Sequence, residues 1–253
     1  MLTAALEHYR QQQRVAALAL REVRRSGNTD LIQTAQIIGA YQTASVTLTL
    51  GATPAELAEQ AIKAPAEGVV VVEAMLTAPQ SVIDRLEKAD SYAMFETIVA
   101  SLIADAGRTA AVVDIGRRPA VTGYVRSLNL PSCGRCAVLA GRVYRFSTGF
   151  LRHPNCDCLM TPTTQELGAE LVLDPTDAIT NAQVTGLSSG DLAALEAGAD
   201  LGQVVNVRKK AAGLTVGSSV TARAGRLTPQ GIQRAASGPD EAVELLRRHG
   251  YIR

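Results

Sequence analysis

The sequence of 253 residues contains no tryptophan, and aromatic residues make up only 4% of it. No uninterrupted apolar run approaches the roughly 20 residues that a membrane-spanning helix needs. The first residues, MLTAALEHYRQQQR, lack the charged and then apolar layout of a signal peptide. These absences predict a soluble chain that is made in a cytoplasm and has no membrane partner.

Hydrophobic residues make up 47% of the chain, which is enough to build a buried core. Alanine and leucine are plentiful where aromatic residues are scarce, and this balance favours helix packing. We expect an α+β protein that is mainly α. The predicted division is a helical domain over residues 1–116, a Cys/His module over 117–165 and a helical or loop segment over 166–253, with GRRP at 116–119 as the first clear break.

Charge is unevenly distributed although the formal net charge is only +1. Residues 117–158 carry seven basic groups and one acidic group, whereas residues 159–202 carry no basic and seven acidic groups. Such blocks can hold segments together or face a polyanion. Solvated faces on a folded domain are the simpler interpretation, so charge alone identifies no partner.

Apolar spacing and capping residues predict several helices. GVVVV at residues 68–72 fits a strand and a buried helix equally well. The predicted helices lie in 2–28, in 29–50, from Pro54 onward with Thr53 as its cap, in 79–107 as one helix or two in series, in 188–198, and from Pro239 to the stop at Gly250.

All four cysteines and one of the three histidines lie within the 26 residues from Cys133 to Cys158. The spacing is C-x2-C, nineteen intervening residues and then C-x-C, with His153 shortly before the second pair. In a reducing compartment, paired cysteines usually bind metal or act in catalysis. We refer to residues 133–158 as the cysteine segment.

The spacing predicts a structural zinc site. A C-x2-C turn directs two sulfur atoms to one Zn²⁺, and if residues 155–159 are extended, Cys156 and Cys158 project from one face. His153 is an alternative ligand, so five candidates compete for four places: Cys133, Cys136, His153, Cys156 and Cys158. Residues 141–146 alternate apolar and basic side chains, which predicts one strand of a small hairpin. The expected unit is a zinc-stapled β-hairpin/α module followed by a helical tail, and four sulfur ligands leave no open position for catalysis.

Other uses of the cysteines stay open. They could be small buried hydrophobic residues, or a disulfide in a chain that later meets an oxidising environment. Cys133 or Cys136 could act as a nucleophile with His153 as its base, but no oxyanion donor or third residue stands out, and G-x-S-x-G is absent. His8 and His249 are better explained as structural or solvated residues.

Basic and aromatic residues surround the cysteines. They would suit a nucleic-acid zinc knuckle, in which Tyr144 and Phe146 stack on bases. Neutralisation of the thiolates, or pairing with the acidic block that follows, is the favoured interpretation. The basic residues concerned are Arg135, Arg142, Arg145 and Arg152.

The cysteine segment resembles a known protein family. CGRCAVLAGRVYRF followed by RHPNCDC is similar to the C-terminal motif of the minor head proteins of tailed bacteriophages, the family named after phage Mu protein F. ADLGQVVNVRKK at 199–210 and LTPQGIQRAA through LLRRHGYI near the end are similar to versions from phages of actinobacteria. The resemblance covers about residues 120–253. Its matched positions are Cys133, Cys136, Leu139, Gly141, Val143, His153, Pro154, Cys156 and Cys158.

The resemblance implies a minor capsid protein in the virion that assists head assembly and DNA packaging or ejection. Its implied partners are the portal protein, the major capsid protein and packaged double-stranded DNA, with assembly in the host cytoplasm. No enzyme is expected, because no catalytic constellation accompanies the motif. The alternatives are a capsid maturation protease and a zinc-knuckle nucleic-acid-binding module.

Overall fold

A computed structural model describes residues 2–27, 30–150, 153, 156, 158–207, 209–210, 213–214, 221–222 and 226–253. By its internal contacts the chain forms two compact units. The first comprises Met1–Asn129 and Arg142–Val172, and the second comprises Leu130–Gly141 and Leu173–Arg253. The structure is mainly helical with short strands, which confirms the expected α+β, mainly α class. The three-part division of the sequence stays a prediction.

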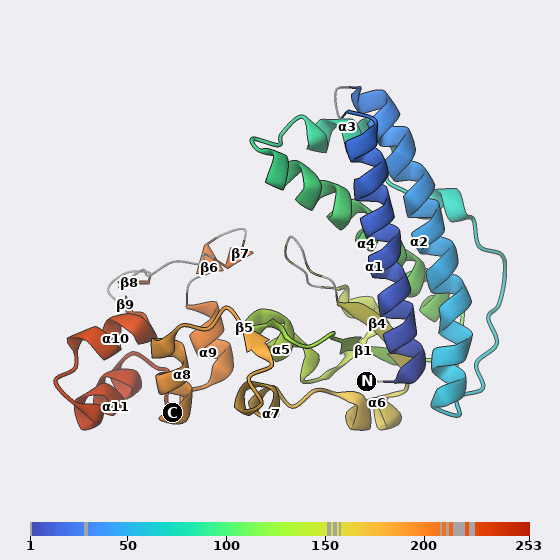
Figure 1. Ribbon diagram of the computed structural model, residues 1–253. Helices are drawn as coiled ribbons and strands as arrows, with labels where there is room; N and C mark the ends of the chain where they lie inside the picture. The colour runs from blue at the N-terminus through green and yellow to red at the C-terminus, as the bar shows by residue number, and fades with distance from the viewer. Residues whose placement is uncertain are drawn as a thin grey trace. The chain divides into compact units, whose positions relative to one another are not determined.

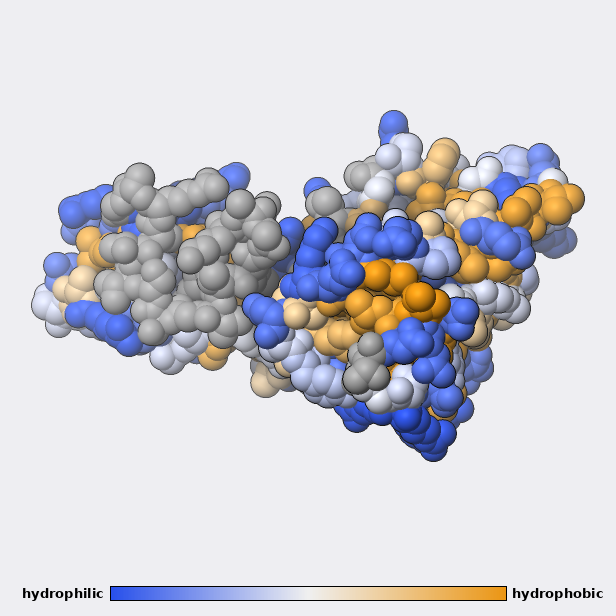
Figure 2. Space-filling view, turned by 90° about the horizontal axis from the view of Figure 1, so that it is seen from above, coloured by the Kyte–Doolittle hydropathy of each residue, from blue (hydrophilic) through white to orange (hydrophobic). Residues whose placement is uncertain are grey.

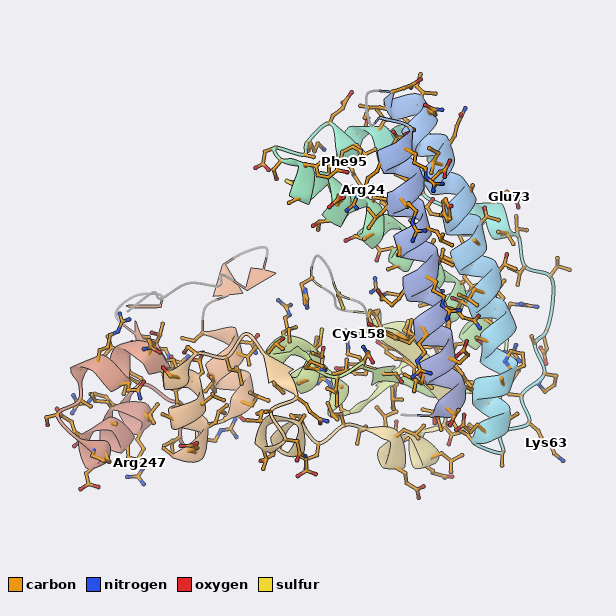
Figure 3. All side chains as sticks on the ribbon, in the orientation of Figure 1. Arg24, Lys63, Glu73, Phe95, Cys158 and Arg247 are labelled. Atoms are coloured by element: carbon orange, nitrogen blue, oxygen red, sulfur yellow. The ribbon has the colours of Figure 1, made fainter. Side chains whose placement is uncertain are left out.

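Long helices form most of the first unit (Figure 1). Their buried apolar side chains, among them Val23, Ile38 and Leu102, form one core shared by α1, α2, α3 and α4. At one end of this bundle Arg24 of α1, labelled in Figure 3, forms an ion pair with Glu96 of α4, with Nε and Oε1 2.7 Å apart. The helical elements are α1 (Thr3–Arg25), α2 (Leu31–Glu59), the 3-10 helix η1 (Val72–Met75), α3 (Pro79–Leu86), α4 (Tyr92–Gly116), the 3-10 helix η2 (Phe146–Thr148) and α6 (Gln165–Leu171).

The first predicted helix is confirmed as α1, but the helix predicted to begin at Pro54 is wrong. Pro54 lies inside α2, which continues to Glu59. A proline in a helix interior loses one backbone hydrogen bond, at about 3 kcal/mol. Burial of Val46 and Leu57 on either side of Pro54 anchors the helix and offsets that loss.

The region predicted as one helix or two forms two, α3 and α4. The expected fading near Gly107 is wrong, because α4 continues to Gly116. A Cβ at Gly107 would lie 2.8 Å from Ser45 Oγ and 2.9 Å from Gln12 Nε2. This glycine therefore allows three helices to approach closely and does not end one. The GVVVV stretch forms neither alternative throughout: the chain is irregular up to Val71, and η1 begins at Val72.

A three-stranded antiparallel sheet with the order β3-β1-β4 belongs to the same unit. Its strands are β1 (Gly123–Ser127), β3 (Val143–Arg145) and β4 (Leu159–Thr163). The strand predicted over 141–146 is present as β3, which pairs with the preceding β1 through Tyr124 opposite Tyr144. All five residues of the central strand β1 and all five of the edge strand β4 are buried, so neither strand has a solvent-facing side.

The second unit consists of short helices and two-residue strands. Its core includes Val204, Ile232, Leu246 and Tyr251, all nearly inaccessible to solvent. The parallel pair β2–β5 joins Ser132 to Val184. The elements are β2 (Ser132–Cys133), α5 (Gly134–Ala140), α7 (Pro175–Thr180), β5 (Val184–Thr185), α8 (Ser189–Glu196), α9 (Leu201–Asn206), β6 (Lys209–Lys210), β7 (Gly213–Leu214), β8 (Thr221–Ala222), β9 (Arg226–Leu227), α10 (Pro229–Ala235) and α11 (Pro239–Arg248).

Capping residues in the sequence correctly predicted the positions of two of these helices, α8 and α11. Ser188 and Asp191 form a reciprocal capping box at the start of α8, with Asp191 N 3.2 Å from Ser188 Oγ. Helix α11 begins at Pro239, carries acids in its first turn and arginines in its last, and is followed by Gly250 at φ +72°.

Apolar side chains are also exposed on the described surface. Val69, Val71 and Ile32 are among them, and Figure 2 shows such groups interspersed with hydrophilic ones. Among the described helices, none combines the length and the apolar character needed to cross a lipid bilayer.

Candidate metal centre

The first cysteine pair lies where a strand turns into a helix. Cys133 ends β2 and is the N-cap of α5, and its Sγ accepts a hydrogen bond from the backbone N–H of Cys136 at 3.4 Å. The C-x2-C spacing produces this contact, because the second cysteine then falls in the first helical turn, where backbone N–H groups lack helical partners. A hydrogen bond from a main-chain N–H stabilises negative charge on sulfur, as a metal ligand requires.

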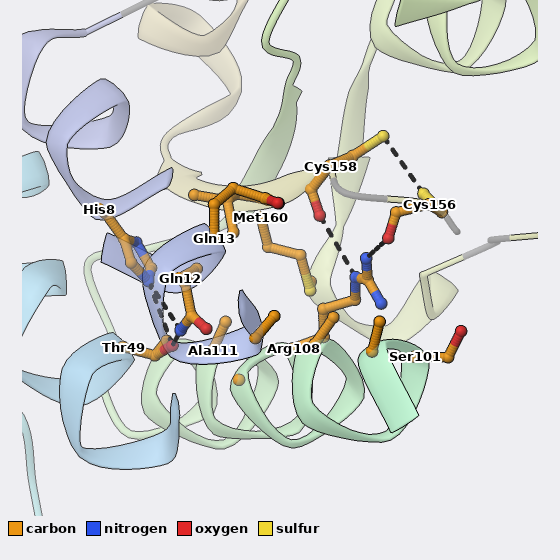
Figure 4. Close-up of a pocket in the computed structure, with 15 residues that line it drawn as sticks. His8, Gln12, Gln13, Thr49, Ser101, Arg108, Ala111, Cys156, Cys158 and Met160 are labelled. Atoms are coloured by element: carbon orange, nitrogen blue, oxygen red, sulfur yellow. Dashed lines mark hydrogen bonds between the residues drawn. The ribbon is translucent and has the colours of Figure 1, made fainter. Parts of the chain in front are cut away.

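The second pair lies immediately before β4. The Sγ atoms of Cys156 and Cys158 are 3.3 Å apart, and both residues are buried. Figure 4 shows the two sulfur atoms side by side, so Cys156 and Cys158 project to the same side as expected, while the extended conformation expected for residues 155–159 falls partly on residues that the structure does not describe. Pro154, Asn155 and Asp157 lie outside the described residues.

The candidate ligand atoms of the cysteine segment form two overlapping groups. Cys133, Cys136 and His153 make one, and Cys136, Cys156 and Cys158 make the other. Within each group the ligand atoms all lie within 4.8 Å of one another. All five side chains that the sequence predicted as ligands are thus in a Cys/His cluster, and Cys136 belongs to both groups.

The donor set fits a thiophilic divalent cation. With zinc–sulfur bonds of about 2.3 Å, neighbouring sulfur atoms of a tetrahedral site are about 3.8 Å apart. The separation between Cys156 and Cys158 is within about half an ångström of that value. Thiolate and imidazole are the ligands that structural zinc prefers, whereas calcium and magnesium require oxygen. The cluster is compatible with a metal site.

Two arginines from outside the cysteine segment contact the second pair. Arg108 of α4 donates hydrogen bonds from Nη2 to the carbonyl oxygen of Cys156 and from Nε to that of Cys158, the latter at 3.3 Å (Figure 4). Arg126 of β1 places Nη1 3.7 Å from Cys156 Sγ. Both arginines are buried, Arg126 with 2% of its surface exposed.

The sequence did not identify these two residues. It assigned neutralisation of the thiolates to arginines within the segment, but Arg142 and Arg145 are exposed, and the guanidinium of Arg142 lies over the Tyr144 ring at 4.7 Å. Arg152 lies outside the described residues. The available signal was the position of Arg126 within the strand sequence GYVRS, where a charged residue on a buried strand needs a partner.

The ring of Tyr144 is not exposed, as the nucleic-acid-binding alternative would need it to be for stacking on bases. Tyr144 is buried and stacks on Tyr124 with 5.2 Å between ring centroids, whereas Phe146 is 45% exposed. Burial raises the pKa of Tyr124 to about 12, and the tyrosine hydroxyl donates to the carbonyl oxygen of Gly149 at 2.6 Å. The aromatic pair therefore belongs to the core beneath the sheet.

A buried polar network connects α1 and α2. His8 Nδ1 lies 2.7 Å from Glu56 Oε1, and His8 Nε2 lies 3.2 Å from Thr49 Oγ1. Gln12 Nε2 donates to Thr49 Oγ1 at 2.8 Å, and Gln12 Oε1 accepts from Ser45 Oγ at 2.8 Å. These mutual hydrogen bonds give His8 a structural place at the helix interface.

The network borders a cavity of about 240 Å³ in the first unit (Figure 4). His8, Gln12 and Thr49 line one side, while Arg108 and Met160 line another. The polar atoms of His8, Gln12 and Arg108 are hydrogen-bonded within the protein, so the cavity offers few groups to a polar ligand.

The remaining histidine, His249, follows the last turn of α11. Burial lowers its pKa, and the positive charges of Arg226 and Arg248 act in the same direction. It lies outside both ligand groups of the cysteine segment.

Comparisons with known proteins identify no relative. No family model matches the chain, and neither a curated protein nor a solved structure matches it.

Proposed function

We propose that the cysteine segment binds one structural Zn²⁺ ion, and that the chain is a minor head protein of a tailed bacteriophage. The observation that carries the metal proposal is the gathering of all five predicted ligands into groups whose ligand atoms lie within 4.8 Å of one another. A full set of protein ligands leaves no position for substrate, which favours a structural ion over a catalytic one.

The size of the neighbouring sheet supports a structural role. Its strands are three to five residues long, and the strand that ends at Cys133 has only two. Elements this short bury little apolar surface, and a metal ion supplies folding energy that such a small unit lacks.

The virion role rests on the motif CGRCAVLAGRVYRF with RHPNCDC and on the similar C-terminal segments. We propose that the protein associates with the portal or the inner capsid, acts in head assembly and in DNA packaging or ejection, and contacts packaged double-stranded DNA. A structural ion suits a scaffold component, because it holds a surface in shape without chemistry.

Elemental analysis tests the metal proposal. Purified protein should contain about one zinc per chain, and the double variant C133S/C136S should lose it together with the folded state of the sheet. Ser147, an exposed residue between the two pairs, provides the control S147A, which should retain the metal. A metal-free parent with rapidly alkylated Cys133 that cleaves a capsid protein would contradict the proposal in favour of the protease.

Binding measurements test the virion role. The full chain should bind a portal preparation in a manner that depends on the intact cysteine segment and persists at high salt. Binding to double-stranded DNA alone, steeply weakened by rising salt, with no portal association would instead support the nucleic-acid-binding module.

A further inference from the structure

Arg126 occupies an unusual position for a charged residue. It lies on β1, where all five residues are buried, and only 2% of its surface is accessible. Its Nη1 is 3.7 Å from the sulfur of Cys156. Transfer of a guanidinium from water to a protein interior is unfavourable unless an anion accompanies it. A thiolate at Cys156 is an anion of the required kind in the required place.

The aromatic ring of Phe150 fixes the orientation of this guanidinium. The Cζ atom of Arg126 lies 3.9 Å from the ring centroid, within the range of a cation–π contact. Arg108 approaches the same ring at 5.4 Å. The ring also packs against Tyr124, with 5.9 Å between centroids. Arg126 is therefore held on a rigid apolar support.

The two arginines divide their contacts with the second cysteine pair. Arg108 binds the main-chain carbonyl oxygens of Cys156 and Cys158, while Arg126 points at a sulfur atom. The first set of contacts holds the main chain of the two cysteines, and the second acts on the charge of the sulfur ligand itself.

We infer that Arg126 is a positioning residue of the metal centre, which compensates the charge of its thiolates and orients Cys156 for ligation. This inference rests on the proposed metal site and adds the residue that sets its stability. Zn²⁺ bound by four thiolates carries a net charge of −2, and by three thiolates and one imidazole a net charge of −1. A buried centre of either charge requires a nearby cation, and Arg126 supplies it.

The consequence is a specific order of metal retention among Arg126 variants. Loss of a residue that hydrogen-bonds a metal ligand typically weakens metal binding by about 10- to 100-fold. R126M removes the charge and every donor, R126Q keeps an N–H donor without the charge, and R126K keeps the charge on a less directional group. R126M and R126Q should release zinc to a chelator about 10- to 100-fold faster than the parent, with R126K between them and the parent.

Cobalt substitution gives a readout that a purely structural role would not move. A cation beside a thiolate draws electron density from sulfur, so its removal should shift the sulfur-to-cobalt charge-transfer band to longer wavelength. R126M and R126Q loaded with Co²⁺ should show this shift, and R126K should restore most of the parent spectrum.

Two further variants separate this role from general packing. R142M alters an exposed arginine that also lies over an aromatic ring, and it should leave zinc release and the cobalt spectrum unchanged. F150L removes the ring that supports Arg126 and should accelerate zinc release by less than R126M does.

The full chain loaded with Zn²⁺ or Co²⁺ provides the decisive comparison. Faster release and a shifted band in R126Q, largely rescued in R126K, support the inference. An R126Q protein that holds zinc and absorbs light like the parent overturns it while the proposed function stands. A parent chain without bound metal overturns both. If R126M fails to fold, the comparison of R126Q, R126K and F150L still decides the question.

Discussion

The helical part of the first unit and the cysteine segment achieve order in different ways. Helices α1, α2 and α4 share a core of large buried side chains, such as Ile38 and Ile103, and a network of polar side chains that satisfy one another. The cysteine segment consists of short elements, and Arg108 and Arg126 from outside the segment contact its buried residues Cys156 and Cys158. The first region therefore carries its stabilisation in its own side chains, whereas under the proposed function the second depends on a metal ion bound by its sulfur atoms.

Removal of the metal should produce the largest difference in stability between the two regions. Treatment of the zinc-loaded chain with a chelator should reduce hydrogen-exchange protection in β1 and β4 by at least about 100-fold, because binding energy is folding energy at such a site. Protection in α1 and α2 should change by less than about threefold. Equal loss in the helices would show that both regions depend on the ion.

Truncation of the buried carboxylate of Glu56 should have the second-largest effect, and it should act on the helical region. In E56A, His8 loses the acceptor that lies 2.7 Å from its Nδ1. We expect the free energy of unfolding to fall by about 2–3 kcal/mol, since a buried polar group is left without its partner. Denaturant titration measures this fall, and E67A at an exposed position is the control. Zinc content should be unchanged.

A methyl group at the helix crossing should have a smaller effect. G107A would place Cβ 2.8 Å from Ser45 Oγ, and overpacking of this kind costs about 1–3 kcal/mol. Higher helix propensity offsets part of this by about 1 kcal/mol. The control is G51A, also helical but with no atom within 4 Å of the added Cβ, which should raise stability. Thermal unfolding of both variants tests whether the added methyl group overpacks the contact at Gly107. A rise in stability in both variants would contradict this prediction.

The smallest effect should come from the cap of α8. S188A removes the side chain that accepts from Asp191 N, and loss of an N-cap costs about 1 kcal/mol. Hydrogen exchange within α8 should report it, with α1 unaffected. An unchanged exchange rate at the first turn of α8 would show that the capping box is dispensable.

The same contrast explains what could be predicted from the sequence. Helices α1 and α11 follow from apolar spacing and terminal residues, since those signals are local. The helix through Pro54 did not, because its continuation depends on contacts that α2 makes with other helices. In the sequence, Gly107 suggests the end of the apolar helical pattern. In the structure it lies where three helices approach closely, which only the assembled bundle reveals.

Within the candidate site, spacing predicted the cluster but not its surroundings. The positions of Cys133 and Cys136 relative to a helix start follow from their separation of three residues. The roles of Arg108 and Arg126 could not be deduced, because both are distant in sequence from the atoms that they contact. The strand sequence GYVRS indicates that Arg126 needs a partner, but it does not say which anion the partner is.

The hydrogen bonds from Arg108 to the two carbonyl oxygens have a consequence for substitutions at Cys156 and Cys158. Arg108 contacts the main chain of Cys156 and of Cys158, so these two hydrogen bonds do not depend on which side chains the two positions carry. Exchange of either sulfur for an imidazole or a carboxylate would change the ion that the proposed site prefers, while both contacts of Arg108 would remain.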